Sequence, residues 1–350
     1  MIKRYESNPI IKPDDILIDN DELEVFGVFN PGAAKFNDEI ILLLRVAVKP
    51  KSEKGWIKIP IADKTDSFAI KILKWKKTKS LKILDKDARF IDINDKRYLT
   101  SISLIYLARI RDGIHFDISK EPALAPSNEH EVFGVEDPRI IRIDEKYYIT
   151  YTAVSENSFC TALASTEDFK KFEKLGIIFP PENKDAVFFP ERINGKYFSL
   201  HRPTVSFIGR PSIWISESED LIHWGKHRIF LTPNNTKWER TKIGAGPQPL
   251  LTDKGWLIFY HSCGDNQTYS MNLILTEKNN TQKIIGKSTK PIFTPRYKYE
   301  KVGVVPNVVF CNGWIAKDKE KILIYYGAAD KYVALAETEI DLLLSSLKRV

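Results

Sequence analysis

Short apolar runs, each bounded by polar turn residues, recur along most of the chain. They are rich in Ile, Val, Tyr, Phe and Thr, as in 39–48 (EIILLLRVAV), 146–155 (KYYITYTAVS) and 255–262 (GWLIFYHS). Runs of this length and composition predict β-strands. Helical periodicity is confined to the end of the chain, where 337–348 (ETEIDLLLSSLK) predicts a short helix. The pattern therefore predicts an all-β protein with a short C-terminal helix.

One phrase, made of a polar start, an apolar run, a polar turn and an aromatic strand, occurs five times. Its copies stand at 87–102, 136–151, 185–200, 245–260 and 306–326. A second phrase carries an aspartate a few residues before an aromatic residue, as in a hairpin turn, with Asp112, Asp168 and Asp220. Units of roughly fifty residues with about four strands each are typical of propeller blades. We therefore predict one five-bladed β-propeller domain over residues 1–350. A two-sheet sandwich is the alternative, but it does not predict regular recurrence.

The polar residues that open these units differ from one unit to the next. In a propeller the innermost strands converge on a central channel, so their starting residues face one another there. Each residue alone could be a solvated turn charge or an ion pair between blades. Unlike acids, amides and bases gathered at one channel instead predict a ligand site. The residues concerned are Asn30, Arg45, Asp87, Arg89, Glu136, Asp137, Arg139, Lys184, Asp185, His201, Arg202, Lys242, His261 and Asp330.

The charges of this set indicate a division of chemical roles. One strand start carries the acids Glu136 and Asp137. The basic residues that we expect to face them are Lys184, Arg202, Lys242 and His261. A carboxylic acid can protonate a departing sugar oxygen, and cationic side chains can hold a tetrahedral anion. Inverting glycosidases need a second carboxylate to activate water, whereas phosphate is itself a nucleophile. One acid opposite an anion-binding group therefore favours a phosphorylase.

Several of these motifs also carry a family resemblance. GVEDPRI at 134–140, KDAVFFPERINGKYFSLHRP at 184–203, KIGAGPQP at 242–249 and YYGAAD at 325–330 resemble glycoside hydrolase family 130, the β-mannoside phosphorylases. The resemblance runs from FNPGAAKF near residue 30 to the end of the chain. It implies a five-bladed propeller and inverting phosphorolysis that yields α-mannose 1-phosphate and a shortened acceptor.

The resemblance also implies roles for individual residues. Asp137 would be the general acid, acting through a mannose hydroxyl, and we expect burial or the nearby Glu136 to raise its pKa. The phosphate would be held by Lys184, Arg202, Lys242 and His261. The mannoside would be held by Asn30, Arg45 and Asp330, with Arg89, Glu136, Arg139 and Asp185 as sugar-binding or supporting residues.

The opening segments 4–16 (RYESNPIIKPDDI) and 21–36 (DELEVFGVFNPGAAKF) look most like enzymes that act on β-1,2-mannobiose or β-1,2-oligomannan. A β-1,4-mannosyl phosphorylase and a β-mannosidase are the alternatives within the family. Outside it, a non-catalytic binding platform would not require unlike residues at successive strand starts. Another five-bladed glycosidase would use acids on three blades, for which Asp87, Asp137 and Asp185 with Glu191 are candidates.

Composition narrows the possible partners. Lys and Arg number 53 against 46 acids, a net charge of +7. The densest lysine stretch, 71–82, alternates with apolar residues and predicts strands with a solvated face rather than a nucleic-acid patch. Such a surplus also suits an anionic substrate.

Other features bear on metals and on the compartment. The chain has six scattered histidines, and we expect neither a metal nor any cofactor, with inorganic phosphate as a co-substrate. Three scattered cysteines, no leader-like start and no long apolar run predict a cytoplasmic enzyme without membrane contact. The oligomeric state stays open, and the C-terminal helix is one candidate contact for a homo-oligomer.

Overall fold

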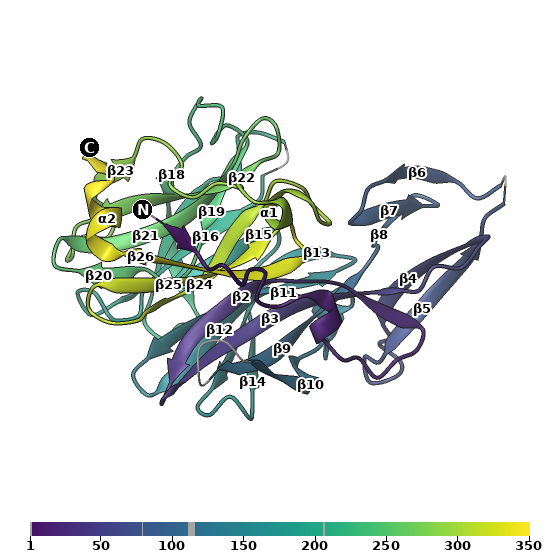
Figure 1. The fold of residues 1–350 in the computed structure, drawn as a ribbon. Helices are drawn as coiled ribbons and strands as arrows, with labels where there is room; N and C mark the ends of the chain where they lie inside the picture. The colour runs from purple at the N-terminus through teal and green to yellow at the C-terminus, as the bar shows by residue number, and fades with distance from the viewer. Residues whose placement is uncertain (1, 79, 111–115, 206) are drawn as a thin grey trace.

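Nearly all regular structure in the chain is β-strand, as the apolar runs predict. The computed structural model describes residues 2–78, 80–110, 116–205 and 207–350 (Figure 1). Within them lie two short α-helices, α1 (Lys298–Lys301) and α2 (Ile340–Ser345), and two 3₁₀ turns, η1 (Pro13–Asp15) and η2 (Glu129–Glu131). None of these helices is long and apolar enough to cross a membrane. The all-β prediction is confirmed.

The strands of the first half form one continuous sheet made of two antiparallel groups. The first group, in order of pairing, is β2 (Leu23–Phe36), β3 (Glu39–Pro50), β9 (Ile102–Ile110) and β10 (Phe116–Leu124). The second group is β11 (Gly134–Ile143), β12 (Lys146–Ser155), β13 (Ser158–Thr166) and β14 (Glu173–Phe179). A single parallel pair, Gly134 with Ser103, joins the two groups through β11 and β9.

The second half contributes three further antiparallel groups. The third is β15 (Asn183–Phe188), β16 (Tyr197–Pro203), β17 (Ile213–Ser218) and β18 (Trp224–Leu231). In the fourth, β19 (Lys242–Ala245) and β20 (Leu250–Thr252) both pair with β21 (Gly255–Cys263), followed by β22 (Tyr269–Thr276), β23 (Ile284–Ser288) and β27 (Leu347–Arg349). The fifth is β24 (Val309–Ala316), β25 (Lys321–Ala328), β26 (Tyr332–Glu339) and the N-terminal β1 (Lys3–Arg4).

Two small sheets are inserted between β3 and β9, and we call them the arm. One is the hairpin of β4 (Trp56–Ala62) and β5 (Ile70–Lys76); the other joins β6 (Ile83–Lys86), β7 (Phe90–Ile93) and β8 (Lys96–Leu99). Figure 1 shows the arm projecting from the five groups. On β5, Lys71, Lys74 and Lys76 are exposed while Leu73 and Trp75 pack on the arm's own apolar cluster. The predicted solvated face of this stretch is confirmed for β5.

Four of the five repeated phrases open a strand group, and one does not. The copies at 136–151, 185–200, 245–260 and 306–326 span the first strands of the second to fifth groups. The copy at 87–102 lies mainly on β7 and β8 of the arm, so its assignment to a blade was wrong. The first group starts instead with β2 and β3, because β3 pairs along its length with β9, from Ile40 with Ile110 to Val48 with Ile102.

The predicted hairpin turns can be checked at two of three positions. Asp168 Oδ1 accepts hydrogen bonds from the N–H groups of Lys170 and Lys171, between β13 and β14. Asp220 Oδ1 accepts in the same way from Ile222 and His223, between β17 and β18. Both turns are confirmed, and Asp112 lies outside the described residues.

The apolar core lies between neighbouring groups. One cluster combines Ile141 of β11, Leu200 of β16 and Ile258 of β21, all almost fully buried. Another joins Leu44 of β3 to Tyr325 of β25. Each group therefore buries its faces against the next, which fixes the relative positions of the strand starts.

The C-terminal helix is shorter than predicted. Residues 337–339 belong to β26, where Glu337 pairs with Leu323 and Glu339 with Lys321. The last residues, Leu347–Arg349, pair with β23 as β27. Strand pairing at both ends leaves only the six residues of α2 helical.

The N-terminus is tied to the end of the chain through a buried ion pair. Strand β1 pairs with β26, and Arg4 Nε lies 2.5 Å from Oε1 of Glu300, whose side chain is fully buried. The Tyr326 hydroxyl donates to the same carboxylate at 2.8 Å. The Arg4 guanidinium also lies 4.3 Å above the ring of Phe293. This cluster anchors β1 to the fifth group.

Replacing Arg4 with Ala should destabilise the protein by about 3 kcal/mol, because it leaves the buried Glu300 carboxylate without its cation. The measurement is the free energy of unfolding in urea. Lys3→Ala, on the same strand but exposed, is the matched control and should change that free energy by less than about 0.5 kcal/mol. Equal effects of the two substitutions would show that the ion pair does not anchor β1.

Candidate active site

The predicted site residues gather around one cavity of about 430 Å³. Eleven of the fourteen line it: Asn30, Arg45, Arg89, Glu136, Asp137, Lys184, Asp185, Arg202, Lys242, His261 and Asp330. Asp87 and His201 do not: Asp87 is exposed and pairs with Arg89, and His201 is buried against Asn183. Arg89 comes from the arm, and the others come from or directly follow strands of all five groups. Arg139 lies beneath the cavity and is 1% exposed. The structure thus brings together residues spread over 300 positions of sequence.

Three of the site residues are placed by the same backbone device. The pairing register shifts between Phe29 and Gly32, between Glu136 and Arg139, and between Lys184 and Val187. In each of these bulges one polar residue has a left-handed backbone, with φ of 48°, 51° and 56° at Asn30, Asp137 and Asp185. Asn and Asp tolerate this conformation better than other residues with a side chain. A bulge re-aims its side chain out of the ladder, here into the cavity or its wall.

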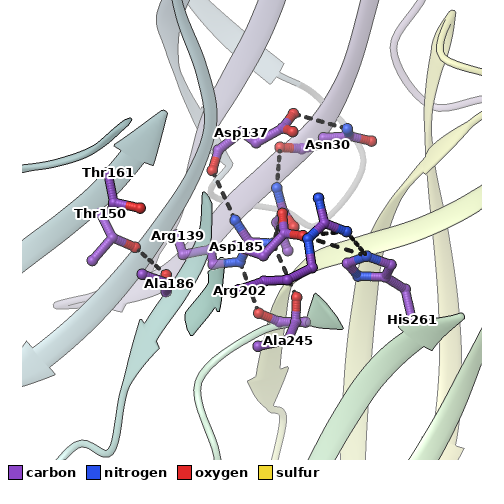
Figure 2. A network of polar contacts seen from close by, with 12 residues as sticks. Asn30, Asp137, Arg139, Thr150, Thr161, Asp185, Ala186, Arg202, Ala245 and His261 are labelled. Carbon is purple, nitrogen blue, oxygen red and sulfur yellow. Dashed lines mark hydrogen bonds and ion pairs between the residues drawn. The ribbon is translucent and has the colours of Figure 1, made fainter. Parts of the chain in front are cut away.

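One end of the cavity, which we call the acid end, is built around Asp137. Its Oδ1 accepts hydrogen bonds from Asn30 Nδ2 and Arg45 Nη1, both at 2.9 Å; Figure 2 shows the first. Arg45 Nη2 also pairs with Glu136 Oε1 at 2.8 Å. Arg45 therefore holds both acids of the EDPR motif, and Asp330 completes this end of the cavity.

The pKa of Asp137 is lowered, not raised. Burial pushes the pKa up, but the charges of Arg45 and Lys184 and the hydrogen bond from Asn30 outweigh it. The expectation of a raised pKa for Asp137 is therefore wrong. In contrast, burial raises the pKa of Asp330 to about 6, although Arg45 opposes it. The pKa of the Asp330 carboxyl group is therefore only about one unit below neutral pH.

A second group of cavity residues, which we call the basic end, consists of Lys184, Arg202, Lys242 and His261. Burial lowers the pKa of Lys242 to about 8, and the charge of Arg202 adds to the effect. Burial also lowers the pKa of His261 to about 3, although Asp185 opposes it. His261 is thus a neutral imidazole at pH 7. The prediction of a cationic group holds for Lys184, Arg202 and Lys242, and His261 contributes hydrogen bonding instead.

Asp185 connects the basic end to the interior. Its Oδ2 lies 3.1 Å from Arg202 Nη1 and 3.5 Å from His261 Nε2, and its Oδ1 accepts from Arg139 Nη2 at 3.2 Å (Figure 2). Burial would raise its pKa, but Arg202, His261 and Arg139 lower it far more. Asp185 is therefore an anion shared by the groups around it.

Arg139 spans three strand groups from below. Its guanidinium donates to the carbonyls of Asp137, Ala245 and Gly246 and to the Asp185 carboxylate, at 2.9–3.2 Å. These hydrogen bonds join Arg139 to backbone carbonyls and to a neighbouring site residue. This contact set fits the supporting role foreseen for Arg139.

Aromatic residues of the cavity wall were not predicted from the sequence. Each of three cavity cations lies over one ring: Arg45 over Phe29 at 4.7 Å, Lys184 over Phe159 at 5.4 Å and Lys242 over Tyr269 at 5.2 Å. Such contacts favour a cation held in place. Nothing in the strand pattern separates these rings from core aromatics, so no sequence signal would have found them.

The basic end also carries polar atoms that lack a partner in the described part of the protein. They are Arg202 Nε and His261 Nδ1, both fully buried. Buried polar groups normally have a hydrogen-bond partner. The three cations that line this end, Lys184, Arg202 and Lys242, suit it to an oxyanion. Among the described residues, no cluster of His, Cys, Asp or Glu could hold a metal ion.

Comparison with known proteins identifies the family. The profile of glycoside hydrolase family 130, described as beta-1,4-mannooligosaccharide phosphorylase, matches residues 80–349. A β-1,2-mannobiose phosphorylase of Listeria innocua is 39% identical over 99% of this chain and 98% of its own length. A 1,2-β-oligomannan phosphorylase of Thermoanaerobacter is 37% identical over 70% of this chain and 81% of its own.

A solved structure agrees with the sequence matches. The complex of the Listeria innocua β-1,2-mannobiose phosphorylase with β-1,2-mannobiose superposes with a TM-score of 0.94 and 38% identity, covering 99% of this chain and 98% of the other. The all-β fold and the acid-and-base cavity are thus those of a carbohydrate-active protein. The chain belongs to glycoside hydrolase family 130.

Gly244 should be essential for the basic end. A Cβ atom there would lie 2.4 Å from His261 Cε1 and 2.5 Å from Asp185 Oδ2, so Gly244→Ala must displace both. We expect affinity for phosphate, measured by equilibrium dialysis, to fall at least about tenfold. Gly225→Ala, where a Cβ would meet nothing within 4 Å, is the control and should leave the affinity unchanged. If Gly244→Ala bound phosphate with unchanged affinity, the basic end would not be the phosphate site.

Proposed function

We propose that the protein is a β-mannoside phosphorylase. It would transfer a terminal β-mannosyl residue to inorganic phosphate with inversion, releasing α-mannose 1-phosphate and a shortened acceptor. The observation that carries this proposal is the cavity itself, which Asp137 lines together with the three cations Lys184, Arg202 and Lys242. The names of the two phosphorylases aligned above support it.

We also propose that the five strand groups are the blades of one propeller domain spanning residues 1–350, with the cavity in its central channel. Support comes from the contribution of every group to the cavity. In order, the groups supply Asn30, Asp137, Lys184, Lys242 and, directly after β25, Asp330.

In this proposal Asp137 is the general acid. The acid must be protonated to act, yet the pKa of Asp137 is low without ligand because cations surround it. Phosphate bound at the basic end would offset the charge of Lys184, so binding of the nucleophile itself raises the pKa of Asp137. Following the family, the proton then passes to the glycosidic oxygen through a mannose hydroxyl.

The remaining roles follow the two ends of the cavity. Lys184, Arg202, Lys242 and His261 would bind phosphate, with Asp185 and Arg139 holding them in place. Asn30, Arg45, Arg89, Glu136 and Asp330 would contact the mannoside.

A hydrolase would need a carboxylate where the basic end lies, to activate water. The cavity acids Glu136 and Asp330 lie with Asp137 around Arg45, whose pKa all three raise. The cavity acid beside the basic end, Asp185, is engaged by the guanidiniums of Arg139 and Arg202. The positions of these acids favour phosphate over water as the nucleophile. A β-mannosidase is therefore the weaker alternative.

For the linkage we propose β-1,2, since the two relatives above carry that linkage in their names. The β-1,4 linkage in the family description is the alternative. We further propose that the enzyme works in the cytoplasm, where Cys160, Cys263 and Cys311 would stay reduced; all three are free and buried.

The test is incubation with β-1,2- and β-1,4-mannobiose, each with and without phosphate, followed by assays for mannose 1-phosphate and free mannose. We expect mannose 1-phosphate from the β-1,2 substrate only when phosphate is present. Free mannose formed equally well without phosphate would make the enzyme a hydrolase. If only β-1,4-mannobiose were turned over, the substrate linkage would be β-1,4 and the proposed β-1,2 linkage would be wrong.

Asp137→Asn should keep the fold and lose turnover by at least about 10³-fold, because the amide cannot donate the proton. Initial rates with saturating substrates measure this, and circular dichroism checks the fold. Glu191→Gln is the control, since Glu191 is exposed and would be an acid only in the three-acid glycosidase. Loss of activity in Glu191→Gln with none in Asp137→Asn would favour that enzyme class.

Phosphate binding should weaken at alkaline pH. The Lys242 ammonium has a pKa of about 8, so its charge is present below pH 8 and lost above it. The KM for phosphate should therefore rise above pH 8, by up to about tenfold per pH unit. Lys242→Arg keeps its charge and should flatten this rise. A KM independent of pH in the unmodified enzyme would exclude Lys242 from the phosphate site.

A further inference from the structure

A buried histidine adjoins the basic end. His201 of β16 is 2% exposed and does not line the cavity, although it immediately precedes the cavity residue Arg202. Its Nδ1 atom lies 3.0 Å from Asn183 Nδ2 and 3.3 Å from Asn183 Oδ1. Asn183 is also buried, and it immediately precedes the cavity residue Lys184 on β15. The two side chains that bind each other are thus each one residue away from a cation of the basic end.

His201 stands opposite the bulge that shapes the basic end. The register of β15 and β16 shifts directly after Lys184, so the two residues Asp185 and Ala186 face the single residue His201. A bulge interrupts the backbone ladder, so other contacts have to hold the strands together here. The same bulge gives Asp185 the left-handed backbone with which its carboxylate reaches Arg202.

Two threonines hold the backbone of this segment from the neighbouring strands β12 and β13. Thr150 Oγ1 donates to the carbonyl of Ala186 at 2.6 Å (Figure 2), and Thr161 Oγ1 donates to the carbonyl of Asn183 at 3.3 Å. These bonds fix the backbone on both sides of Lys184 and Asp185. The contact with His201 adds a tie between the Asn183 side chain and β16.

The His201 ring is itself held on its other sides. It stacks on Phe179 with 4.2 Å between ring centroids and an interplanar angle of 11°, and its Nε2 lies 3.2 Å from Nδ1 of His227. Burial, with a smaller effect of His227, lowers the pKa of His201 to about 3. The ring is therefore neutral at pH 7, so it ties the strands together without adding charge to the cations nearby.

We propose that His201 and Asn183 are positioning residues of the phosphate site. Their contact holds the bulge that presents Lys184 and Asp185, and it holds Arg202 at the matching point of β16. This inference rests on the proposed phosphorylase function and extends it to residues that touch neither substrate. Loss of the contact weakens phosphate binding and leaves mannoside binding unchanged, because the acid end is built from other strands.

The experiment replaces His201 by side chains that keep different contacts. His201→Phe keeps a ring against Phe179 but forms no hydrogen bond; His201→Asn keeps an amide near the position of Nδ1, and His201→Gln keeps one near Nε2. With His201→Phe we expect the KM for phosphate to rise about tenfold, the equivalent of one lost hydrogen bond. The KM for β-1,2-mannobiose should change by less than about twofold. His201→Asn should restore most of the phosphate KM, and His201→Gln should not.

Two further substitutions make the test independent of how well the His201 variants fold. Asn183→Ala should raise the phosphate KM about as much as His201→Phe, and the double variant should show no further rise, because both changes remove the same contact. His223→Ala is the matched control. This histidine lies on the turn between β17 and β18 with its side chain 87% exposed, and its loss should leave the kinetic constants unchanged.

Each alternative result has a distinct meaning. An unchanged phosphate KM in both His201→Phe and Asn183→Ala, or additive rises in the double variant, would overturn the inference alone. Equal rises in KM for both substrates, or a His201→Asn variant no better than His201→Phe, would show a general structural role and also overturn it. If the unmodified enzyme formed no mannose 1-phosphate, the proposed function would fail, and this inference with it.

Discussion

The buried carboxylate of Asp185 is the interaction on which the site depends. Two guanidiniums, those of Arg139 and Arg202, and the imidazole of His261 converge on it with almost no exposure to water. Buried like charges repel strongly unless an opposite charge lies between them. Asp185 therefore makes it possible to bury the guanidiniums of Arg139 and Arg202 close together. Through Arg139 it also fixes the backbone of Asp137 and of the segment that follows β19.

Backbone bulges direct three polar side chains of the site out of their strands. Asn30, Asp137 and Asp185 each leave their strand at a register shift with a left-handed backbone. In the resulting cavity the cations Arg45 and Lys184 lower the pKa of Asp137, whereas burial raises the pKa of Asp330 to about 6.

Much of the fold follows from local patterning. The run at 146–155 coincides with β12, and four of five phrases mark the starts of strand groups. The arm was missed because 87–102 has the same polar and apolar alternation as a blade start. Only its pairing partners distinguish the two, and these lie far away in sequence. The helix was overextended because its flanks pair with remote strands.

The site was predictable to a similar extent. Polar residue types in the repeated strand pattern identified the polar cavity-lining residues, but not all of them lie at strand starts. Glu136, Lys184 and Lys242 lie at or near the start of their strands, whereas Arg45 lies inside β3, and Arg202 and His261 lie near the ends of β16 and β21. The pKa directions of Asp137 and His261 were not predictable, because they depend on distances to charges on other strand groups. The aromatic rings under Arg45, Lys184 and Lys242 have the same sequence context as core residues.

The central claim is that phosphate at the basic end attacks the sugar on the face opposite the acceptor. The most direct measurement is nuclear magnetic resonance of the sugar phosphate formed from β-1,2-mannobiose, because phosphate on the anomeric oxygen keeps its anomeric configuration fixed. The account predicts α-mannose 1-phosphate as the initial product. Initial formation of the β-anomer would place phosphate and acceptor on the same face and contradict the arrangement of the two ends.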